Sequence, residues 1–243
     1  MRVSRWRSAL EVVQALSIIA VCAVILWVLL LGGSQPTTAP TRTSTQRPVS
    51  PPLPVEPLSL EGAAILGNAG AKWALIVFSE FQCPYCGRFA RETLPTLESD
   101  YIKPGRILLA FRHFPLPNHE FAVKAAEAVE CAGQQGKFWE MHDRLFFDQR
   151  QLDLASLADR ARVLGLDVRQ FDTCLGGTTA IRVQADRESG RALMVTGTPT
   201  FFAGIVQPDR RVKVLRRLAG AAPVAQFKAA LDSLLSSPAA EVK

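Results

Sequence analysis

The sequence predicts an α/β fold, in which a single sheet is covered by helices and a long helical block is inserted between its strands. Three observations lead to this prediction. The continuous apolar run from Trp73 to Phe78 is typical of a buried central strand. The residues that follow, Gly87 to Tyr101, carry apolar side chains at helical spacing. From His119 to Met194 the periodic segments are all helical, and strand patterns return only after Pro199.

The length of 243 residues, with 48% hydrophobic residues and a net charge of +6, suits one globular domain with appendages. We expect a basic N-terminus at 1–11 and an apolar segment at 12–32 that is long enough to span a bilayer core. The arginines before this segment predict that the rest of the chain is exported. A membrane-anchoring helix is therefore expected, with a cleaved signal peptide as the alternative because small residues follow at 32–34.

A linker is predicted between the apolar segment and the domain, at 33–57. It holds seven prolines among threonines and serines and has no apolar periodicity, so it cannot bury a core and is expected to be disordered. Cys22, within the apolar segment, is interpreted as a small apolar residue. The domain itself is expected at 58–238, followed by a short tail at 239–243.

Within the domain, Ile107 to Phe111 predicts a second buried strand, which a right-handed crossover would place parallel to the first. Pro95 interrupts the connecting helix, so a kink is expected there. An insertion at about 119–194 follows. Its predicted helices are Phe121–Ala132, Lys137–Phe147, Leu154–Leu164, Val168–Leu175 and Thr178–Leu193. The aromatic residues of this block are expected in the core, and they are Phe138, Trp139, Phe146 and Phe147.

The last part of the domain returns to strands and then to a helix. Thr200–Ile205 and Arg211–Leu215 flank a turn at Pro208 and Asp209, which predicts an antiparallel hairpin. Pro223 opens a final helix with one apolar face. Basic residues cluster at 210–217, and their alternation along a strand indicates a solvated face; since no nucleic-acid motif accompanies them, nucleic-acid binding is not expected.

The chemistry is expected at Cys83, Pro84, Tyr85 and Cys86, a CPYC motif at the junction between the first strand and its helix. Cys83 falls at the helix N-cap and Pro84 at the first helical position, where a missing N–H costs nothing. Free N–H groups and the helix dipole then favour the Cys83 thiolate, which is the nucleophilic form. Cys86, one turn further, is expected to be the buried resolving cysteine.

Two other interpretations of the cysteine pair fit the sequence less well. A zinc site would need further ligands, but there is no second close pair and His113, His119 and His142 are not at ligand spacing. A purely structural disulfide would close too short a loop to add much stability. The three histidines are instead interpreted as surface or packing residues. Glu80, three residues before Cys83, is either a proton relay for Cys86 or a solvated carboxylate at the strand end.

The string from Phe78 to Cys86, together with Gly197 to Phe202, resembles the DsbA-like branch of the thioredoxin superfamily over roughly Leu58 to Leu235. The resemblance implies a thioredoxin fold with a helical insertion and dithiol–disulfide exchange in an extracytoplasmic compartment. It makes Cys83 the nucleophile, Cys86 the resolving cysteine and Pro199 a cis-proline. Pro84, Tyr85 and Thr198 are then expected to contact substrates.

From this resemblance we expect an oxidase that donates the disulfide between Cys83 and Cys86 to exported client proteins with thiols, without a metal or an organic cofactor. A membrane protein of the DsbB or vitamin-K-epoxide-reductase type is the expected reoxidant. The alternatives are a tethered reductase and a redox-inert module whose cysteine pair carries Cu(I) or zinc. In an oxidising compartment, the two remaining cysteines of the domain, Cys131 and Cys174, are expected to form a second disulfide that staples the insertion.

Overall fold

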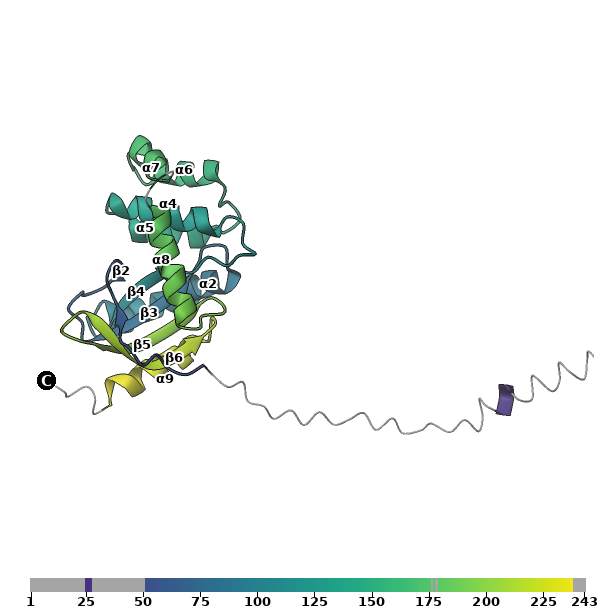
Figure 1. Cartoon of the computed structure of the whole chain (residues 1–243), viewed down its shortest axis with the longest axis vertical. Coiled ribbons are helices and arrows are strands. Elements are labelled where there is room, and N and C mark those ends of the chain that lie inside the picture. Colours follow the sequence, from purple (N-terminus) through teal and green to yellow (C-terminus); the bar gives the residue numbers. More distant parts are fainter. Residues whose placement is uncertain (1–24, 28–50, 176, 178, 238–243) are drawn as a thin grey trace, which may run out of the picture. The chain divides into compact units, whose positions relative to one another are not determined.

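The computed structural model describes residues 25–27, 51–175, 177 and 179–237 (Figure 1). The chain divides into two units, Met1–Val49 and Ser50–Lys243. The predicted N-terminus, most of the apolar segment and of the linker, and the tail lie outside the described residues, so these boundaries stay predictions. The described end of the linker, 51–57, has no helix or strand. Among the described residues, no helix combines the length and apolarity that a membrane crossing needs.

The domain is built on a six-stranded sheet in the order β1-β6-β5-β3-β4-β2. The central strand, β3, is parallel to β4 and antiparallel to β5 on its other side. The strands are β1 (Leu58–Ser59), β2 (Ala64–Leu66), β3 (Trp73–Ser79), β4 (Leu108–His113), β5 (Thr200–Val206) and β6 (Arg211–Ala219). The two long strands before the insertion and the hairpin after it are confirmed. The edge strands β1 and β2 were not predicted, because two or three residues are too few to show a period.

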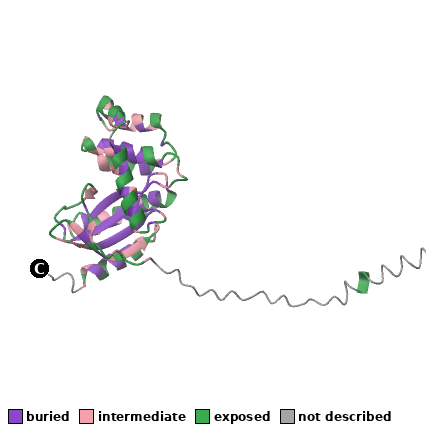
Figure 2. Cartoon of the chain, in the orientation of Figure 1, coloured by how far each residue is buried: buried purple, intermediate pink, exposed green. Residues whose placement is uncertain are grey.

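Every residue of β3 is buried, because helices cover both faces of the sheet (Figure 2). Successive side chains of a strand point to opposite faces. Trp73, Leu75 and Val77 accordingly belong to one core cluster, whereas Ala74 and Ile76 belong to the other. A continuous apolar run, rather than alternation, is what such a strand requires.

The helix after β3 departs from α geometry around Pro95, as expected from the proline. It runs through α2 (Pro84–Arg88), a wide π-helical stretch η1 (Phe89–Thr93), α3 (Leu94–Leu97) and a second π-helical stretch η2 (Glu98–Ile102). Because proline has no N–H to donate, the preceding turn widens, and the N–H of Leu94 bonds the carbonyl of Phe89 five residues back.

The insertion consists of five helices whose bounds lie within three residues of the predicted ones. They are α4 (Ala122–Gln134), α5 (Phe138–Phe147), α6 (Leu154–Val163), α7 (Val168–Leu175) and α8 (Thr179–Ala192). In Figure 1, α4 and α5 lie between the sheet and the outer helices α6 and α7, and α4 packs against α5, α7 and α8. α8 leads back to the start of β5.

The insertion meets the sheet through an aromatic cluster. Phe81 and Phe111 stack at 5.6 Å, and Phe146 lies 4.8 Å from Phe81, measured between ring centroids. Phe138 and Trp139 also contact Phe111. The prediction of a core position is wrong for Phe147, whose side chain is 84% exposed. Adjacent helical residues point about 100° apart, so Phe147 faces outward when Phe146 faces the core.

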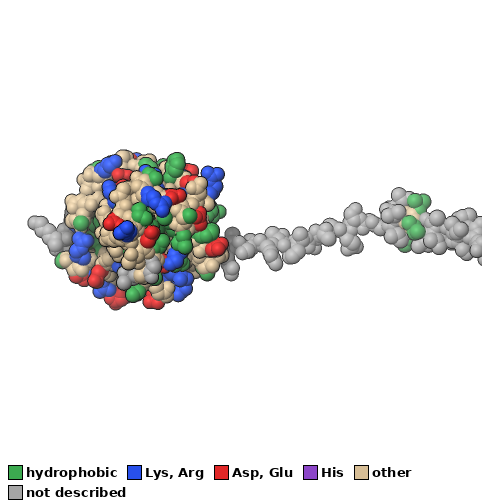
Figure 3. Space-filling model, turned by 90° about the horizontal axis from the view of Figure 1, so that it is seen from above, with side chains coloured by type: hydrophobic (Ala, Val, Ile, Leu, Met, Phe, Trp, Pro, Cys, Tyr) green, Lys and Arg blue, Asp and Glu red, His purple; other side chains and the backbone are tan. Residues whose placement is uncertain are grey.

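The final helix, α9 (Val224–Leu235), follows Pro223 as expected. Its Phe227 packs against both Phe89 and Phe201, so that α9 contacts the helix after β3 and the sheet. Charged side chains of both signs are scattered over the face shown in Figure 3. Several arginines of the predicted basic cluster bond backbone carbonyls, and Arg217 donates to Leu193 and Met194 at the end of α8.

Candidate active site

The pairing of β3 with β5 brings together two segments that are far apart in the sequence. Phe78 lies opposite Thr200 in the register of these antiparallel strands. The residues that follow β3 therefore lie close to the residues that precede β5, at the C-terminal end of β3. As a result, Cys83 lies beside Thr198, with 3.4 Å between its Sγ and the Thr198 carbonyl oxygen.

Cys83 is the N-cap of α2, with φ −70° and ψ 121°, and Pro84 is the first helical residue. Cys83 and Cys86 are both free thiols. Cys83 is 3% exposed and Cys86 1%, so the predicted order of exposure is confirmed by a small margin. The Thr198–Pro199 peptide bond is cis, as the resemblance implied, and Pro199 is buried directly after the residue whose carbonyl faces Cys83.

Hydrogen bonds lower the pKa of Cys83 to about 5, even though burial alone would raise it. The largest contribution comes from the Cys86 thiol, which donates to the Cys83 sulfur. The Thr198 hydroxyl and the backbone N–H groups of Cys86 and Tyr85 add to it. At neutral pH Cys83 is therefore a thiolate.

Cys86 has the opposite environment. Burial, together with the hydrogen bond and the negative charge of Cys83, raises the pKa of Cys86 well above its ordinary value. The two thiols of one motif are thus strongly differentiated, because one is stabilised as a thiolate and the other is kept protonated. This is the arrangement of an attacking and a resolving cysteine.

Glu80 is fully buried, so the interpretation as a solvated strand-end carboxylate is wrong. Burial raises the pKa of Glu80 to about 7, and the nearby Cys83 charge adds to this, while hydrogen bonds from Gln82 and His119 oppose it. One carboxylate oxygen accepts the Gln82 N–H at 2.7 Å, and the other pairs with Nδ1 of His119. A carboxyl group with a pKa near neutrality can both accept and donate protons.

The interpretation of the histidines is wrong for His119, which is the partner of Glu80 and 19% exposed in its side chain. A histidine three residues before a helix gives no sequence signal of this contact, because Glu80 is 39 residues away. His113 and His142 are packing residues, as predicted. Both are buried against Phe81 and Phe111, and His113 also bonds Glu130 at 2.8 Å.

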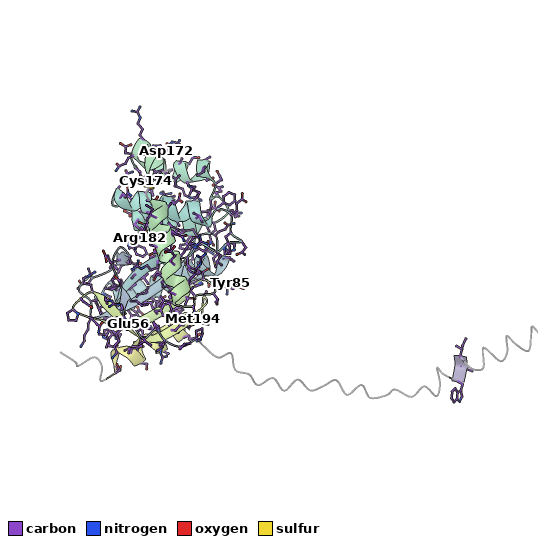
Figure 4. The ribbon with its side chains drawn as sticks, viewed as in Figure 1. Glu56, Tyr85, Asp172, Cys174, Arg182 and Met194 are labelled. Carbon is purple, nitrogen blue, oxygen red and sulfur yellow. A yellow bond between two sulfur atoms is a disulfide. The ribbon has the colours of Figure 1, made fainter. Side chains whose placement is uncertain are left out.

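Pro84 and Tyr85 are exposed at the mouth of the site, where the resemblance places substrate contacts. Tyr85 is 54% exposed, and the Arg88 guanidinium lies 5.4 Å from its ring centre. Figure 4 labels Tyr85 at the surface on the α2 side of the domain. Thr198 is buried, so its side chain offers little surface to a substrate.

The second disulfide is confirmed. Cys131 of α4 and Cys174 of α7 are bonded, with 5.7 Å between their Cα atoms and a sequence separation of 43. The bond joins two helices of the insertion, as expected. Among the described residues, there is no group of three or more His, Cys, Asp or Glu side chains that could share a metal ion.

Sequence reasoning missed one further residue that touches the active-site loop. Gln149, in the connection between α5 and α6, donates to the backbone carbonyls of Phe81 and Cys83, each at 2.8 Å. A glutamine in a polar loop belongs to no motif, and the contact joins positions 66 and 68 residues apart. The sequence carries no local signal of it.

A family model described as Thioredoxin matches residues 59–218. The chain belongs to the thioredoxin family. The matched range begins in β1 and reaches β6, so it includes the CPYC motif, the whole insertion and the cis-proline.

Solved structures of similar fold are DsbA-like proteins. Wolbachia pipientis alpha-DsbA1 is 24% identical, covers 73% of this chain and 92% of its own, and gives a TM-score of 0.64. BdbD from Bacillus subtilis, in its oxidised form, is 20% identical, with coverages of 77% and 100% and a TM-score of 0.64. DsbA2 from Pseudomonas aeruginosa is 24% identical, with coverages of 71% and 93% and a TM-score of 0.55. The fold is thus that of DsbA-like thiol–disulfide oxidoreductases.

Curated relatives carry a different name. A protein named Na⁺/H⁺ antiporter NhaA 1 from Salinispora arenicola is 38% identical over 152 residues, which are 62% of this chain and 22% of that protein. One of the same name from Mycobacterium sp. (strain KMS) is 33% identical over 163 residues, 63% of this chain and 26% of that protein. The chain spans about a quarter of the length of these relatives.

These findings correct the predicted localisation, a domain anchored to the membrane by a single N-terminal helix. The relatives are named as antiporters, which are membrane proteins, and only a thioredoxin-like part of them matches this chain. No helix among the described residues is long and apolar enough to cross a membrane. The predicted segment 12–32 lies outside the described residues except for 25–27. The prediction rested on the length and apolarity of this run and on the arginines before it, which are properties of the sequence and do not establish a membrane-spanning helix.

Proposed function

We propose that this chain is a protein disulfide oxidase that transfers the disulfide between Cys83 and Cys86 to client proteins with thiols. The observation that carries the proposal is the contrast between the two cysteines. The pKa of Cys83 is lowered to about 5, while that of Cys86 is raised well above its ordinary value. Stabilising the Cys83 thiolate stabilises the reduced pair, which makes the disulfide oxidising.

The exchange runs in two steps. A client thiolate attacks Sγ of Cys83, a mixed disulfide forms, and the bond to Cys86 breaks, so that Cys86 leaves as a thiolate and takes up a proton. A second client thiolate then attacks the client sulfur of the mixed disulfide. Cys83 leaves as a thiolate, the client has gained a disulfide, and the pair is reduced. The low pKa of Cys83 makes it a good leaving group in this second step.

Glu80 is the group that we assign to proton handling at Cys86. A buried thiolate with a raised pKa must be protonated quickly as it leaves, and Glu80 holds a proton near neutral pH because its pKa is raised to about 7. His119 connects Glu80 to solvent, since it pairs with the carboxylate and is partly exposed. No cofactor takes part in these steps.

The disulfide between Cys131 and Cys174 supports action in an oxidising compartment of the kind in which exported proteins form their disulfides. In that setting the clients are exported proteins with free thiols, and Pro84, Tyr85 and the Thr198 backbone are their contact points. The reduced pair is then reoxidised by a membrane protein of the DsbB or vitamin-K-epoxide-reductase type.

The test is to mix the oxidised full chain with a reduced peptide that contains two cysteines, and to follow the loss of peptide thiols. The wild-type chain is expected to oxidise the peptide. Cys83→Ser is expected to be inactive. Cys86→Ser is mixed instead with the peptide in its disulfide form, and it is expected to accumulate a mixed disulfide, because Cys83 attacks the peptide disulfide, releases one peptide thiol and has no Cys86 thiol to resolve the new bond. A wild-type chain that leaves the peptide reduced, or a Cys83→Ser variant that still oxidises it, would overturn the proposal.

A further inference from the structure

Gln149 reaches from the helical insertion to the active-site loop. It lies two residues after the end of α5, yet its Nε2 atom is 2.8 Å from the carbonyl oxygen of Phe81 and 2.8 Å from that of Cys83. We call this pair of hydrogen bonds the Gln149 clamp. The clamp therefore holds the two peptide groups on either side of Gln82, in the short segment that ends at Cys83, the N-cap of α2.

Arg91 fixes the orientation of the Gln149 carboxamide. Its Nη1 atom donates to the carbonyl of Phe146 and, at 3.3 Å, to Oε1 of Gln149. A guanidinium group can only donate, so the amide oxygen must face Arg91 and the amide nitrogen must face the two carbonyls. Both N–H groups of the amide are then used, one on each carbonyl.

Gly87 makes room for the clamp. A Cβ atom at position 87 would lie 2.0 Å from Oε1 of Gln149, which is far inside van der Waals contact. The same glycine donates its N–H to the Cys83 carbonyl at 3.1 Å. The Cys83 carbonyl therefore accepts from α2 on one side and from Gln149 on the other, and its peptide plane cannot turn without breaking one of these bonds.

We infer that Gln149 is a positioning residue for disulfide exchange: by clamping the Phe81 and Cys83 carbonyls, it holds the Cys83 side chain against Thr198 and the first N–H groups of α2. This inference rests on the proposed function. It gives the insertion a role at the site, because Gln149 bonds the carbonyl of the reacting cysteine. Among the described residues, the hydrogen bonds of the Gln149 side chain join it to the Phe81 and Cys83 carbonyls and to Arg91 and to neither sulfur, so it acts through the backbone of Cys83.

The consequence is a specific change in Cys83 when the clamp is lost. Without it the Cys83 peptide can reorient, and the N–H groups of Tyr85 and Cys86 no longer align with the sulfur. The thiolate is then less stabilised, so the pKa of Cys83 rises and the reduced pair becomes less stable relative to the disulfide.

The test compares Gln149→Ala and Gln149→Met with a matched control in the full chain. Gln135 makes a similar pair of bonds to the backbone of Asp167, at 3.2 Å and 2.9 Å, within the insertion and away from the site. For each variant, the thiolate absorbance of Cys83 is titrated and the redox equilibrium with glutathione is measured. Loss of a hydrogen bond predicts a roughly three- to tenfold shift of that equilibrium toward the oxidised chain, with a higher Cys83 pKa. Gln135→Ala is expected to change neither.

A second variant displaces Gln149 without removing it. Gly87→Ala meets only the ends of flexible side chains, Gln149 and Arg91, so the chain is expected to fold with Gln149 pushed aside. On its own, Gly87→Ala should shift the redox equilibrium and the Cys83 pKa as Gln149→Ala does. Combined with Gln149→Ala, it should cause no further shift, because the effects of coupled residues are not additive. The inference would be overturned if the Gln149 variants kept the wild-type Cys83 pKa and redox equilibrium, or if Gln135→Ala shifted both by the same amount. Failure of the wild-type chain to oxidise peptide thiols would instead count against the proposed function, because the Cys83 titration does not depend on activity.

Discussion

At the scale of single residues, the site works by giving two identical side chains opposite proton affinities. Cys83 is surrounded by donors: the Cys86 thiol, the Thr198 hydroxyl and two backbone N–H groups. Cys86 is buried and faces the Cys83 charge. The sequence was sufficient to assign these roles, because the CPYC spacing and the proline at the first helical position are local features. The contact with Thr198 could not be derived locally, since this residue lies 115 positions away in the sequence.

The depressed pKa of Cys83 makes the stability of the reduced chain pH-dependent. The folded pKa of about 5 lies below the value of about 8.5 for a free cysteine, so the thiolate favours the folded, reduced state. This contribution is complete above about pH 8.5 and is lost as the pH falls through about 5. We therefore expect the reduced chain to lose stability relative to the oxidised chain over this window. Thermal unfolding of both forms at several pH values checks this, with reduced Cys83→Ser as the control. A pH-independent difference between the two forms would contradict it.

Glu80 gives a second prediction at this scale. If it protonates the leaving Cys86, Glu80→Gln should slow peptide oxidation by at least about tenfold and remove an inflection near pH 7 from the rate profile. Stopped-flow measurement of the rate against pH tests this. Glu127→Gln is the matched control, because Glu127 is also buried but pairs with Lys124 on α4. A normal rate and profile in Glu80→Gln would rule out the relay.

At the scale of elements, the sequence was most informative where a segment is long and its period is clear. The helices of the insertion and strands β3 and β4 fall close to their predicted bounds because their apolar faces set the pattern. The edge strands β1 and β2 could not be predicted, since they form by pairing with β6 and β4 and have no apolar pattern of their own. The contacts of His119 and Gln149 could not be predicted for a related reason, because both depend on how the insertion packs against the sheet.

The disulfide between α4 and α7 should stabilise the insertion without taking part in exchange. Its loop of 43 residues predicts a contribution of up to about 4 kcal/mol in the chain-entropy account. We expect the double variant Cys131→Ala, Cys174→Ala to unfold at lower denaturant concentration and to keep wild-type peptide oxidation under native conditions. Denaturant unfolding and the peptide assay measure the two quantities. Undiminished stability would show that the helices hold the insertion without the bond.

At the scale of the whole molecule, the domain combines a thioredoxin-family sheet with a helical block that contributes to the site. Glu80, Cys83 and Cys86 come from the β3–α2 junction, Thr198 and Pro199 from the start of β5, and Gln149 from the insertion. The relatives named as antiporters share this thioredoxin-like part over about a quarter of their length. All the residues to which we assign the exchange chemistry lie within the domain.

The reduction potential of the Cys83–Cys86 pair tests the central claim most directly, because it reports how much the reduced form is stabilised. The full chain would be equilibrated with glutathione redox buffers, and the fraction of reduced pair would be measured by alkylation. The account predicts a potential well above that of thioredoxin, which is about −270 mV. A measured value near about −270 mV would contradict the oxidase assignment and indicate a reductase.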